Sequence, residues 1–453
     1  MESQVRSAAP APSEKPSGAA SGEGFSPWPV VACLTALAAL LRFSTLGVQN
    51  FWPDEAVTAA LVDQDLGGML SVIPHSESTP PLYYLLAWLW SRAFGTGEVG
   101  LRALSALFGT LTIPMVYAAG ARLVSKRVAL YATLLAAVSP ALVWYSQEAR
   151  AYALLFLLCA TSLWLFARAV EEPRGWTLTA WAATCVAALY THYFAAFFVG
   201  AEAVALLVLG RERRWILLAL GAMAAAAVCL LPIALQQASQ GNADWIAQVP
   251  LRTRTADVGG MFLAGETADY FDYAVPSLAA LSAAAACLLL WSDRPGERNR
   301  ALLVGGIAIA AVLLPLALDA AGSHYVLGRN LLPLWLPLAL VVAAGVVGAR
   351  LRAAAVLIGS ALVLGSLVTT IAVPMDRDLQ RERITADLAG LPVDVDHARL
   401  ASRVKFAEGD EARPVQSLPP CPGGYSTASN DARRLSDGSD GVIMTSVVCV
   451  EAP

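Results

Sequence analysis

The chain has 453 residues, of which 57% are hydrophobic and only 15% are charged, and its formal net charge at pH 7 is −4. With a mean hydropathy of +0.57, this composition excludes an ordinary soluble globular protein and indicates a polytopic membrane protein. Lysines and arginines are scattered and form no basic patch, so no nucleic acid partner is expected.

Long Ala-, Leu- and Val-rich stretches recur along the chain with short polar gaps. Several reach the roughly 20 residues that a helix needs to cross a bilayer. We therefore predict an all-α membrane domain (28–373) with about eleven transmembrane helices, after an N-terminus (1–27) expected to be disordered and cytoplasmic. The predicted spans are 29–46, 101–121, 128–145, 151–168, 176–191, 194–210, 215–235, 275–291, 301–319, 330–348 and 354–373.

The apolar segment Pro81–Phe94 decides the topology, because its about 14 residues are too short to span comfortably. We expect it to lie in the outer interface as a juxtamembrane helix, with Trp88 and Trp90 as anchors. Every basic linker then falls in the cytoplasm, as the positive-inside rule requires, whereas a spanning segment would place them all outside. These linkers contain Arg122/Lys126/Arg127, Arg168/Arg174, Arg211/Arg213/Arg214, Arg294/Arg298/Arg300 and Arg350/Arg352.

This topology gathers the polar residues on the outer face of an inner (plasma) membrane. The first outer loop, 47–100, contains Phe51-Trp52-Pro53-Asp54-Glu55, where we expect Pro53 to end the first helix at the water–lipid boundary, and then His75 and Glu77. The other outer segments are Tyr145–Tyr152, Tyr190–Tyr193, the loop 237–273, His324–Asn330 and the tail.

A transporter or flippase should instead show polar residues on both faces or at the bilayer centre. Arg42 is the only charged residue that we place well within a span. The asymmetry favours an outward-facing active site over a translocation path.

The carboxylates of this face are candidate catalytic groups. Asp54 and Glu55 are either a solvated acidic pair or a general base with its neighbour. Glu148 is either a second catalytic carboxylate facing Asp54 or one half of an ion pair with Arg150 that caps a helix. Two facing carboxylates could also bind a divalent cation, although no His or Cys spacing suggests zinc.

The outer arginines suit a lipid phosphate. Arg150 and Arg329 are candidate ligands for the phosphate of a polyprenyl-phosphate sugar, since a guanidinium can donate two parallel hydrogen bonds to it. For Arg329 the alternative is snorkelling to the membrane surface. The polar and aromatic candidates for substrate binding are Tyr83, Tyr145, Gln147, Tyr152, His192 and Tyr193. The stretch Thr191–Tyr193 could equally be an interfacial aromatic belt.

Several stretches resemble the GT-C glycosyltransferases, in particular the protein O-mannosyltransferase-like branch that includes bacterial lipid A aminoarabinose and galacturonic acid transferases. They are Trp52–Ala56, Ser78–Leu86, Leu101–Gly109, Tyr145–Leu154 and Tyr190–Phe194, with Arg329–Pro333 similar to an Arg-Tyr-Leu-Leu-Pro motif in which Asn330 replaces Tyr. The resemblance implies a GT-C helical core and a polyprenyl-phosphate sugar donor. It also implies that Asp54 is the catalytic base, with Glu55 beside it, and that Glu148 is the second acidic site.

The expected function is therefore inverting transfer of a sugar from a polyprenyl-phosphate donor to an extracytoplasmic acceptor, which is a protein hydroxyl, a lipid or a cell-envelope glycan. The alternatives are a transporter or flippase of lipid-linked sugars and an inactive scaffold subunit. The tail, 374–453, is expected outside as a small appendage, either acceptor-binding or a structural cap, with strands at 442–444 and 447–450. A disulfide between Cys421 and Cys449 is plausible there.

Overall fold

The computed structural model describes residues 26–48, 51–241, 245–265 and 274–390, and four strands between residues 425 and 449. Up to residue 390 the regular structure is helical, so the predicted all-α class is confirmed. The helices of the bundle are α1 Trp28–Phe43, α5 Glu98–Leu123, α6 Lys126–Ala137, α7 Pro140–Ser146, α8 Tyr152–Glu171, α9 Gly175–Thr191, α10 Ala195–Leu209, α11 Arg213–Val228, α12 Leu231–Ser239, α15 Ala274–Leu288, η2 Leu289–Trp291, α16 Pro295–Ala320, η3 Arg329–Leu334, α17 Trp335–Gly348 and α18 Arg352–Gly390.

Two further groups of helices occupy the connections. The first predicted outer loop forms α2 Pro53–Asp63, α3 Leu66–Ser76 and α4 Leu82–Phe94, and the loop after α12 forms α13 Trp245–Gln248 and α14 Leu251–Ala264. The segment expected to be a juxtamembrane helix is thus α4. In the tail, β1 Tyr425–Ser426 pairs antiparallel with β4 Val448–Cys449, and β2 Asn430–Arg434 with β3 Asp440–Met444, which matches both predicted strands. Cys421 lies outside the described residues.

Each predicted span coincides with one helix or with two consecutive helices. Within the described part of the chain, six helices are long and apolar enough to cross a membrane, or eight if each bent pair is one span. The bends are 57° between α6 and α7 and 43° between α11 and α12. The helices α1 and α10 are shorter apolar helices. A multi-pass membrane protein is confirmed, and the number eleven stays a prediction.

Arg42 stabilises the bend between α6 and α7. Its side chain is fully buried at the end of α1, and it donates to the carbonyl oxygens of Ala136 and Ala137, each at 3.1 Å, and to Oγ of Ser146, also at 3.1 Å. Because Pro140 interrupts the helix, the carbonyls of the last turn of α6 have no partner within it. A buried guanidinium satisfies them and complements the negative end of the helix dipole.

The expectation that Arg42 is the only charged residue well inside a span is wrong, because Glu202 lies in the middle of α10. Its side chain is fully buried and accepts hydrogen bonds from Oγ of Ser162 at 3.0 Å and from Nε1 of Trp181 at 2.9 Å. These donors belong to α8 and α9. The carboxyl group therefore joins three helices by hydrogen bonds in an apolar setting, a packing role that is common between membrane helices.

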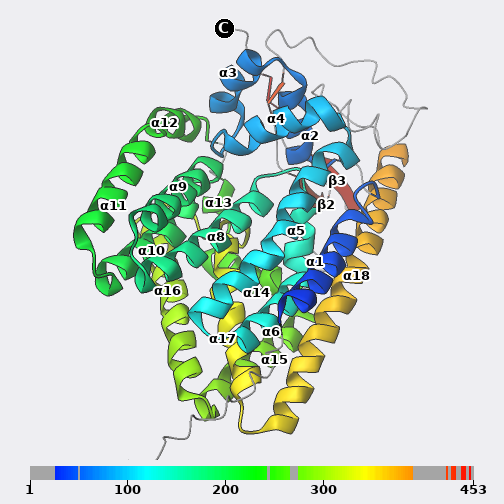
Figure 1. Cartoon of the computed structure of the whole chain (residues 1–453). Coiled ribbons are helices and arrows are strands. Elements are labelled where there is room, and N and C mark those ends of the chain that lie inside the picture. The colour runs from blue at the N-terminus through cyan, green and yellow to red at the C-terminus, as the bar shows by residue number, and fades with distance from the viewer. Residues whose placement is uncertain are drawn as a thin grey trace, which may run out of the picture.

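The helices α2, α3 and α4 lie together at one end of the bundle (Figure 1). Four of the five basic linkers contact one another at the other end of the helices. The contacts that join them are Arg122–Glu171 at 2.5 Å, Nη1 of Arg300 to the carbonyl oxygen of Val124 at 3.4 Å, and Arg350–Asp293 at 2.5 Å. The grouping of the linkers thus agrees with the charge argument, while their side of the membrane stays a prediction.

We expect a reporter fused after Glu212, between α10 and α11, to lie in the cytoplasm and one fused after Ser239, at the end of α12, to lie outside. Alkaline phosphatase should be active only at the second position, and green fluorescent protein should fluoresce only at the first. Phosphatase activity at Glu212 would show that the topology is the opposite of the predicted one and that the site does not lie on the outer face.

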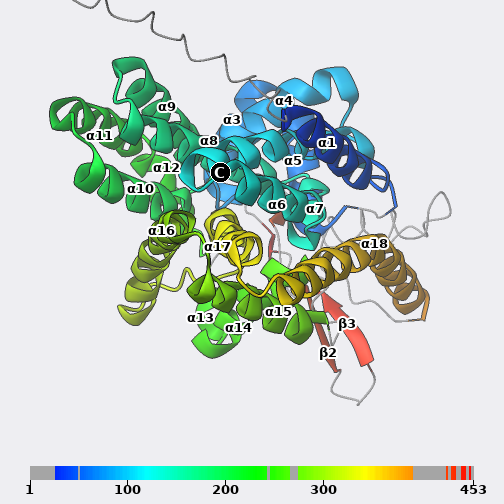
Figure 2. The same cartoon turned by 60° about the horizontal axis from the view of Figure 1, so that its bottom comes forward.

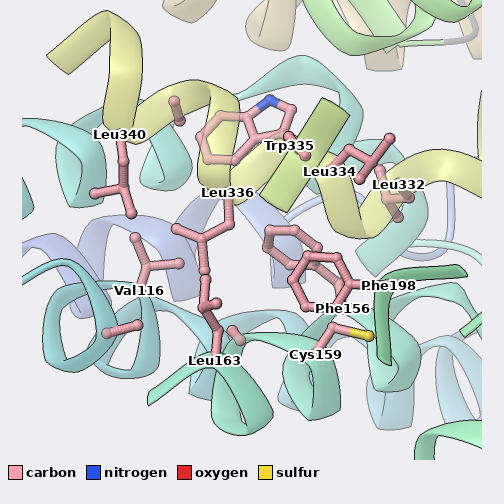
Figure 3. Packing of buried hydrophobic residues seen from close by; sticks show 14 of the residues in the cluster. Val116, Phe156, Cys159, Leu163, Phe198, Leu332, Leu334, Trp335, Leu336 and Leu340 are labelled. Atoms are coloured by element: carbon pink, nitrogen blue, oxygen red, sulfur yellow. The ribbon is translucent and has the colours of Figure 1, made fainter. Parts of the chain in front are cut away.

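The core lies between α5, α8, α10 and the η3–α17 segment. Figure 3 shows Val116 of α5 and Phe156, Cys159 and Leu163 of α8 packed against Leu332, Leu334, Trp335, Leu336 and Leu340, with Phe198 of α10 beside them. At the contact between α15 and α17, a Cβ on Gly345 would come within 1.8 Å of the carbonyl oxygen of Ala285. Small residues let membrane helices approach closely. This packing determines where η3, and hence Arg329, lies.

Candidate active site

The start of α2 separates the two adjacent carboxylates. Trp52 is the extended N-cap residue, and Pro53, expected to end a helix, instead begins α2 as its first residue. Asp54 and Glu55 follow at the second and third positions, where carboxylates complement the positive end of the helix dipole. Since successive residues of a helix point about 100° apart, the two side chains leave α2 in different directions.

Glu55 points into the protein. Its side chain is fully buried, with Oε1 accepting from Nε of Arg102 at 2.8 Å and Oε2 from Nη2 at 2.5 Å. The backbone N–H groups of Ala149 and Trp52 also donate to this carboxylate, at 2.8 and 3.0 Å. Nη1 of Arg102 in turn donates to the carbonyl oxygen of Leu46 at 2.8 Å. Because Glu55 joins the ends of α1, α2 and α5 to the loop before α8, its geometry favours a structural role.

Replacing Glu55 with Gln is expected to destabilise the protein, because an amide cannot accept both branches of the Arg102 guanidinium. Breaking a buried pair in this way costs about 3–5 kcal/mol. The measurement is the thermal unfolding of the purified protein in detergent, and Asp293→Asn is the matched control. That variant breaks an exposed pair with Arg350, which contributes less than about 1 kcal/mol. If Glu55→Gln unfolds at the wild-type temperature, Glu55 becomes a catalytic candidate again.

Asp54 points away from the core and meets Arg329. Its Oδ2 lies 3.9 Å from Nη1 of Arg329, and the side chains are 44% and 34% exposed, respectively. Nη1 of Arg150 donates to the backbone carbonyl of Asp54 at 3.3 Å. The structure therefore brings together three predicted site residues that come from α2, from the turn before α8 and from η3. The long and partly exposed contact leaves Asp54 and Arg329 accessible to a ligand.

Arg150 pairs with Glu77 rather than with Glu148. Its Nη1 donates to Oε2 of Glu77 at 3.0 Å, and the hydroxyl of Tyr84 donates to the same oxygen at 2.7 Å. Burial alone would lower the pKa of Arg150, but Glu77 and the other acidic groups around it hold this pKa above its usual value. Arg150 thus stays charged next to the backbone of Asp54, and most of its side chain is buried. Neither the proximity of Glu77 nor its pairing was predicted.

Tyr152, at the start of α8, lies close enough to Arg329, Arg150, Glu148 and Asp54 for their charges to act on its hydroxyl group. We refer to these five residues as the charged site. Within it, Glu148 is the second carboxylate that the sequence predicts.

Aromatic rings line one side of the charged site. The rings of Tyr145 and Tyr152 are 4.8 Å apart, and those of Tyr152 and His192 are 5.6 Å apart, between centroids. Burial, together with the positive charges of Arg329 and Arg150, lowers the pKa of His192 to about 3. His192 is therefore neutral at physiological pH and contributes an aromatic surface rather than a charge.

Three predicted substrate-binding residues are engaged elsewhere. Tyr83 is fully buried and hydrogen-bonds Oγ of Ser105 at 2.9 Å, whereas the hydroxyl of Tyr193 donates to Gln237 at 2.8 Å. Gln147 donates to the last carbonyls of α1, at 3.0 and 3.1 Å. These contacts favour packing roles for all three. Among the described residues, no three His, Cys, Asp or Glu side chains are grouped so as to hold a metal ion, and the divalent cation stays a prediction.

Residues 78–236 match the family model of the dolichyl-phosphate-mannose-protein mannosyltransferases. No curated protein matches this sequence. Three similar solved structures each give a TM-score of 0.50. They are ArnT from Cupriavidus metallidurans in the apo state (19% identity, 81% of this chain, 66% of that chain), the same protein bound to undecaprenyl phosphate (16%, 82%, 82%), and the archaeal oligosaccharyltransferase AglB from Archaeoglobus fulgidus in complex with an inhibitory peptide and a dolichol-phosphate (12%, 87%, 60%).

The structure therefore has the GT-C fold, and residues 78–236 are similar to the protein O-mannosyltransferase family. The GT-C fold expected from the sequence motifs is confirmed, and the expected similarity to the protein O-mannosyltransferases is found over residues 78–236. The chain spans slightly less than two thirds of the apo ArnT structure, at 66%, and 60% of AglB.

Proposed function

We propose that this protein transfers a sugar from a polyprenyl-phosphate donor to a hydroxyl group of an extracytoplasmic acceptor. The observation that carries the proposal is the contact between Asp54 and Arg329, a partly exposed carboxylate beside a partly exposed guanidinium. Two similar structures add support, since one holds undecaprenyl phosphate and the other a dolichol-phosphate.

In this proposal Asp54 acts on the acceptor and Arg329 acts on the leaving group. The acceptor oxygen attacks the anomeric carbon while the bond from that carbon to the phosphate oxygen breaks. Asp54 takes the proton of the acceptor hydroxyl as general base. Arg329 binds the leaving polyprenyl phosphate and stabilises its charge. A single displacement of this kind inverts the anomeric configuration.

Arg150 and the aromatic residues beside the charged site support Asp54 and Arg329. Arg150, held by Glu77, donates to the backbone of Asp54 and keeps positive charge close to the phosphate position. The aromatic rings of Tyr145, Tyr152 and His192 offer an apolar face of the kind on which a sugar ring can pack. The identity of the sugar depends on this surface.

The test is turnover by the purified protein in lipid nanodiscs, supplied with a panel of undecaprenyl-phosphate sugars. Mass spectrometry should detect undecaprenyl phosphate released in the presence of acceptor and not in its absence. The acceptor to be supplied is identified by comparing the envelope glycans, lipids and glycoproteins of a deletion strain with those of its parent. A deletion strain with an unchanged envelope, and no release from any donor, would contradict the proposal.

A further inference from the structure

A second group of charged residues lies outside the charged site, between the outer loop and the end of α16. Arg254 of α14 is buried, and its Nη1 lies 2.7 Å from Oδ1 of Asp319, which is also buried. Nδ1 of His324 lies 2.9 Å from the same oxygen. We call Arg254, Asp319 and His324 the Arg254 network. Neither Arg254 nor Asp319 was among the site residues predicted from the sequence.

The Arg254 network connects α14 with the turn before it and with the segment before η3. Nε of Arg254 donates to the carbonyl oxygen of Val249, in the turn between α13 and α14, at 2.9 Å. Its Nη1 also reaches the carbonyl oxygen of Val326, at 3.5 Å, three residues before Arg329. A guanidinium can make these contacts together because its donors point in several fixed directions.

Two further contacts link the same segments to Arg329. The guanidinium of Arg329 lies over the ring of Trp245 in α13, with 5.6 Å between its Cζ and the ring centroid, which suits a cation–π interaction. A Cβ on Gly328 would come within 2.8 Å of Met261 of α14, so α14 packs directly against the backbone next to Arg329. The helix α14 also packs against α15, beside it in Figure 2.

From these contacts we infer that the Arg254 network is a positioning device for the donor phosphate. It holds α13, α14 and the segment before η3 in one arrangement, in which Trp245 covers one face of the Arg329 guanidinium. Nη1 of the same guanidinium faces Asp54. Trp245 and Arg254 do not touch the reacting atoms in this inference, and act through Arg329. The assignment of phosphate to Arg329 rests on the proposed function.

The test compares Asp319→Asn with wild type in nanodiscs by two measurements. Hydrogen–deuterium exchange should rise in residues 323–334 and 245–265, since Arg254 loses its buried counterion. Affinity for undecaprenyl phosphate should fall by about 2- to 150-fold, the range of coupling between residues in one network. In an Arg329→Ala background, Asp319→Asn should cause no further loss. His324→Ala, at a partly exposed position, should shift both measurements less and in the same direction.

Asp293→Asn is the control, because it removes an Asp–Arg pair at the other end of the bundle and should change neither measurement. Unchanged exchange across 323–334 in both Asp319→Asn and His324→Ala would overturn the inference without touching the proposed function. An equal loss of affinity with and without Arg329 would overturn it as well. If Arg329→Ala alone leaves the affinity unchanged, the proposed phosphate site fails, and the exchange measurement still decides whether the network positions Arg329.

Discussion

Asp54→Asn should reduce transfer by about 10²- to 10⁴-fold, the usual contribution of a general base. The substitution keeps the size and polarity of the side chain and removes only its ability to accept the acceptor proton. Because the side chain is 44% exposed, the fold should be unaffected. The measurement is single-turnover transfer from a defined undecaprenyl-phosphate sugar, with the apparent donor affinity determined in parallel and expected to be unchanged.

Asp63→Asn is the matched control, since Asp63 lies at the exposed end of the same helix, α2. Near-normal turnover in Asp54→Asn would exclude Asp54 as the base and make Glu148 the candidate base. Loss of protein from the membrane, with Asp63→Asn expressed normally, would instead indicate that Asp54 stabilises the fold.

Arg329→Ala should raise the donor concentration needed for half-maximal rate by about 10- to 100-fold, the range expected for losing a charge-assisted hydrogen-bonded pair with phosphate. Arg329→Lys should restore only part of this, because an ammonium cannot donate two parallel hydrogen bonds and does not stack on Trp245 as a planar guanidinium does. The measurement is turnover against donor concentration at saturating acceptor. The dependence on acceptor concentration should change little.

Arg252→Ala serves as the control, because Arg252 is an exposed arginine of the neighbouring helix α14. The same experiment with Arg150→Ala is expected to show a smaller change in donor affinity and a loss of stability, since Glu77 would remain buried without its partner. An unchanged donor dependence in both alanine variants would show that the phosphate binds elsewhere.

The organisation of the membrane domain is readable in the sequence because it depends on local properties. Hydropathy over about 20 residues marks a span, and the basic linkers mark which ends of the spans lie together. Every predicted span is helical in the structure, and the short segment Pro81–Phe94 forms α4 beside α2. Asp54 and Arg329 were singled out for the same reason, as charged residues at the end of an apolar stretch.

A closer local interpretation would also have separated Asp54 from Glu55. Pro at the first position of a helix and Glu at the third are start signals, and the sequence Trp52-Pro53-Asp54-Glu55 contains both. Because Pro53 was expected to end α1, the start of α2 at this residue was not predicted. Likewise, an arginine such as Arg102 near the start of an apolar span predicts a buried partner, because an unpaired charge in the membrane costs free energy.

What only the tertiary structure decided is which charges meet. Glu55 pairs with Arg102, Arg150 with Glu77, and Arg254 with Asp319, and the partners in each pair come from different helices or loops. No local pattern encodes these pairings, because they depend on how helices far apart in the chain pack. The sequence by itself determined the class of protein and the residues able to do its chemistry. The packing of α5, α8, α10 and α17 determined which of them face one another, since a buried charge is stable only where that packing supplies its partner.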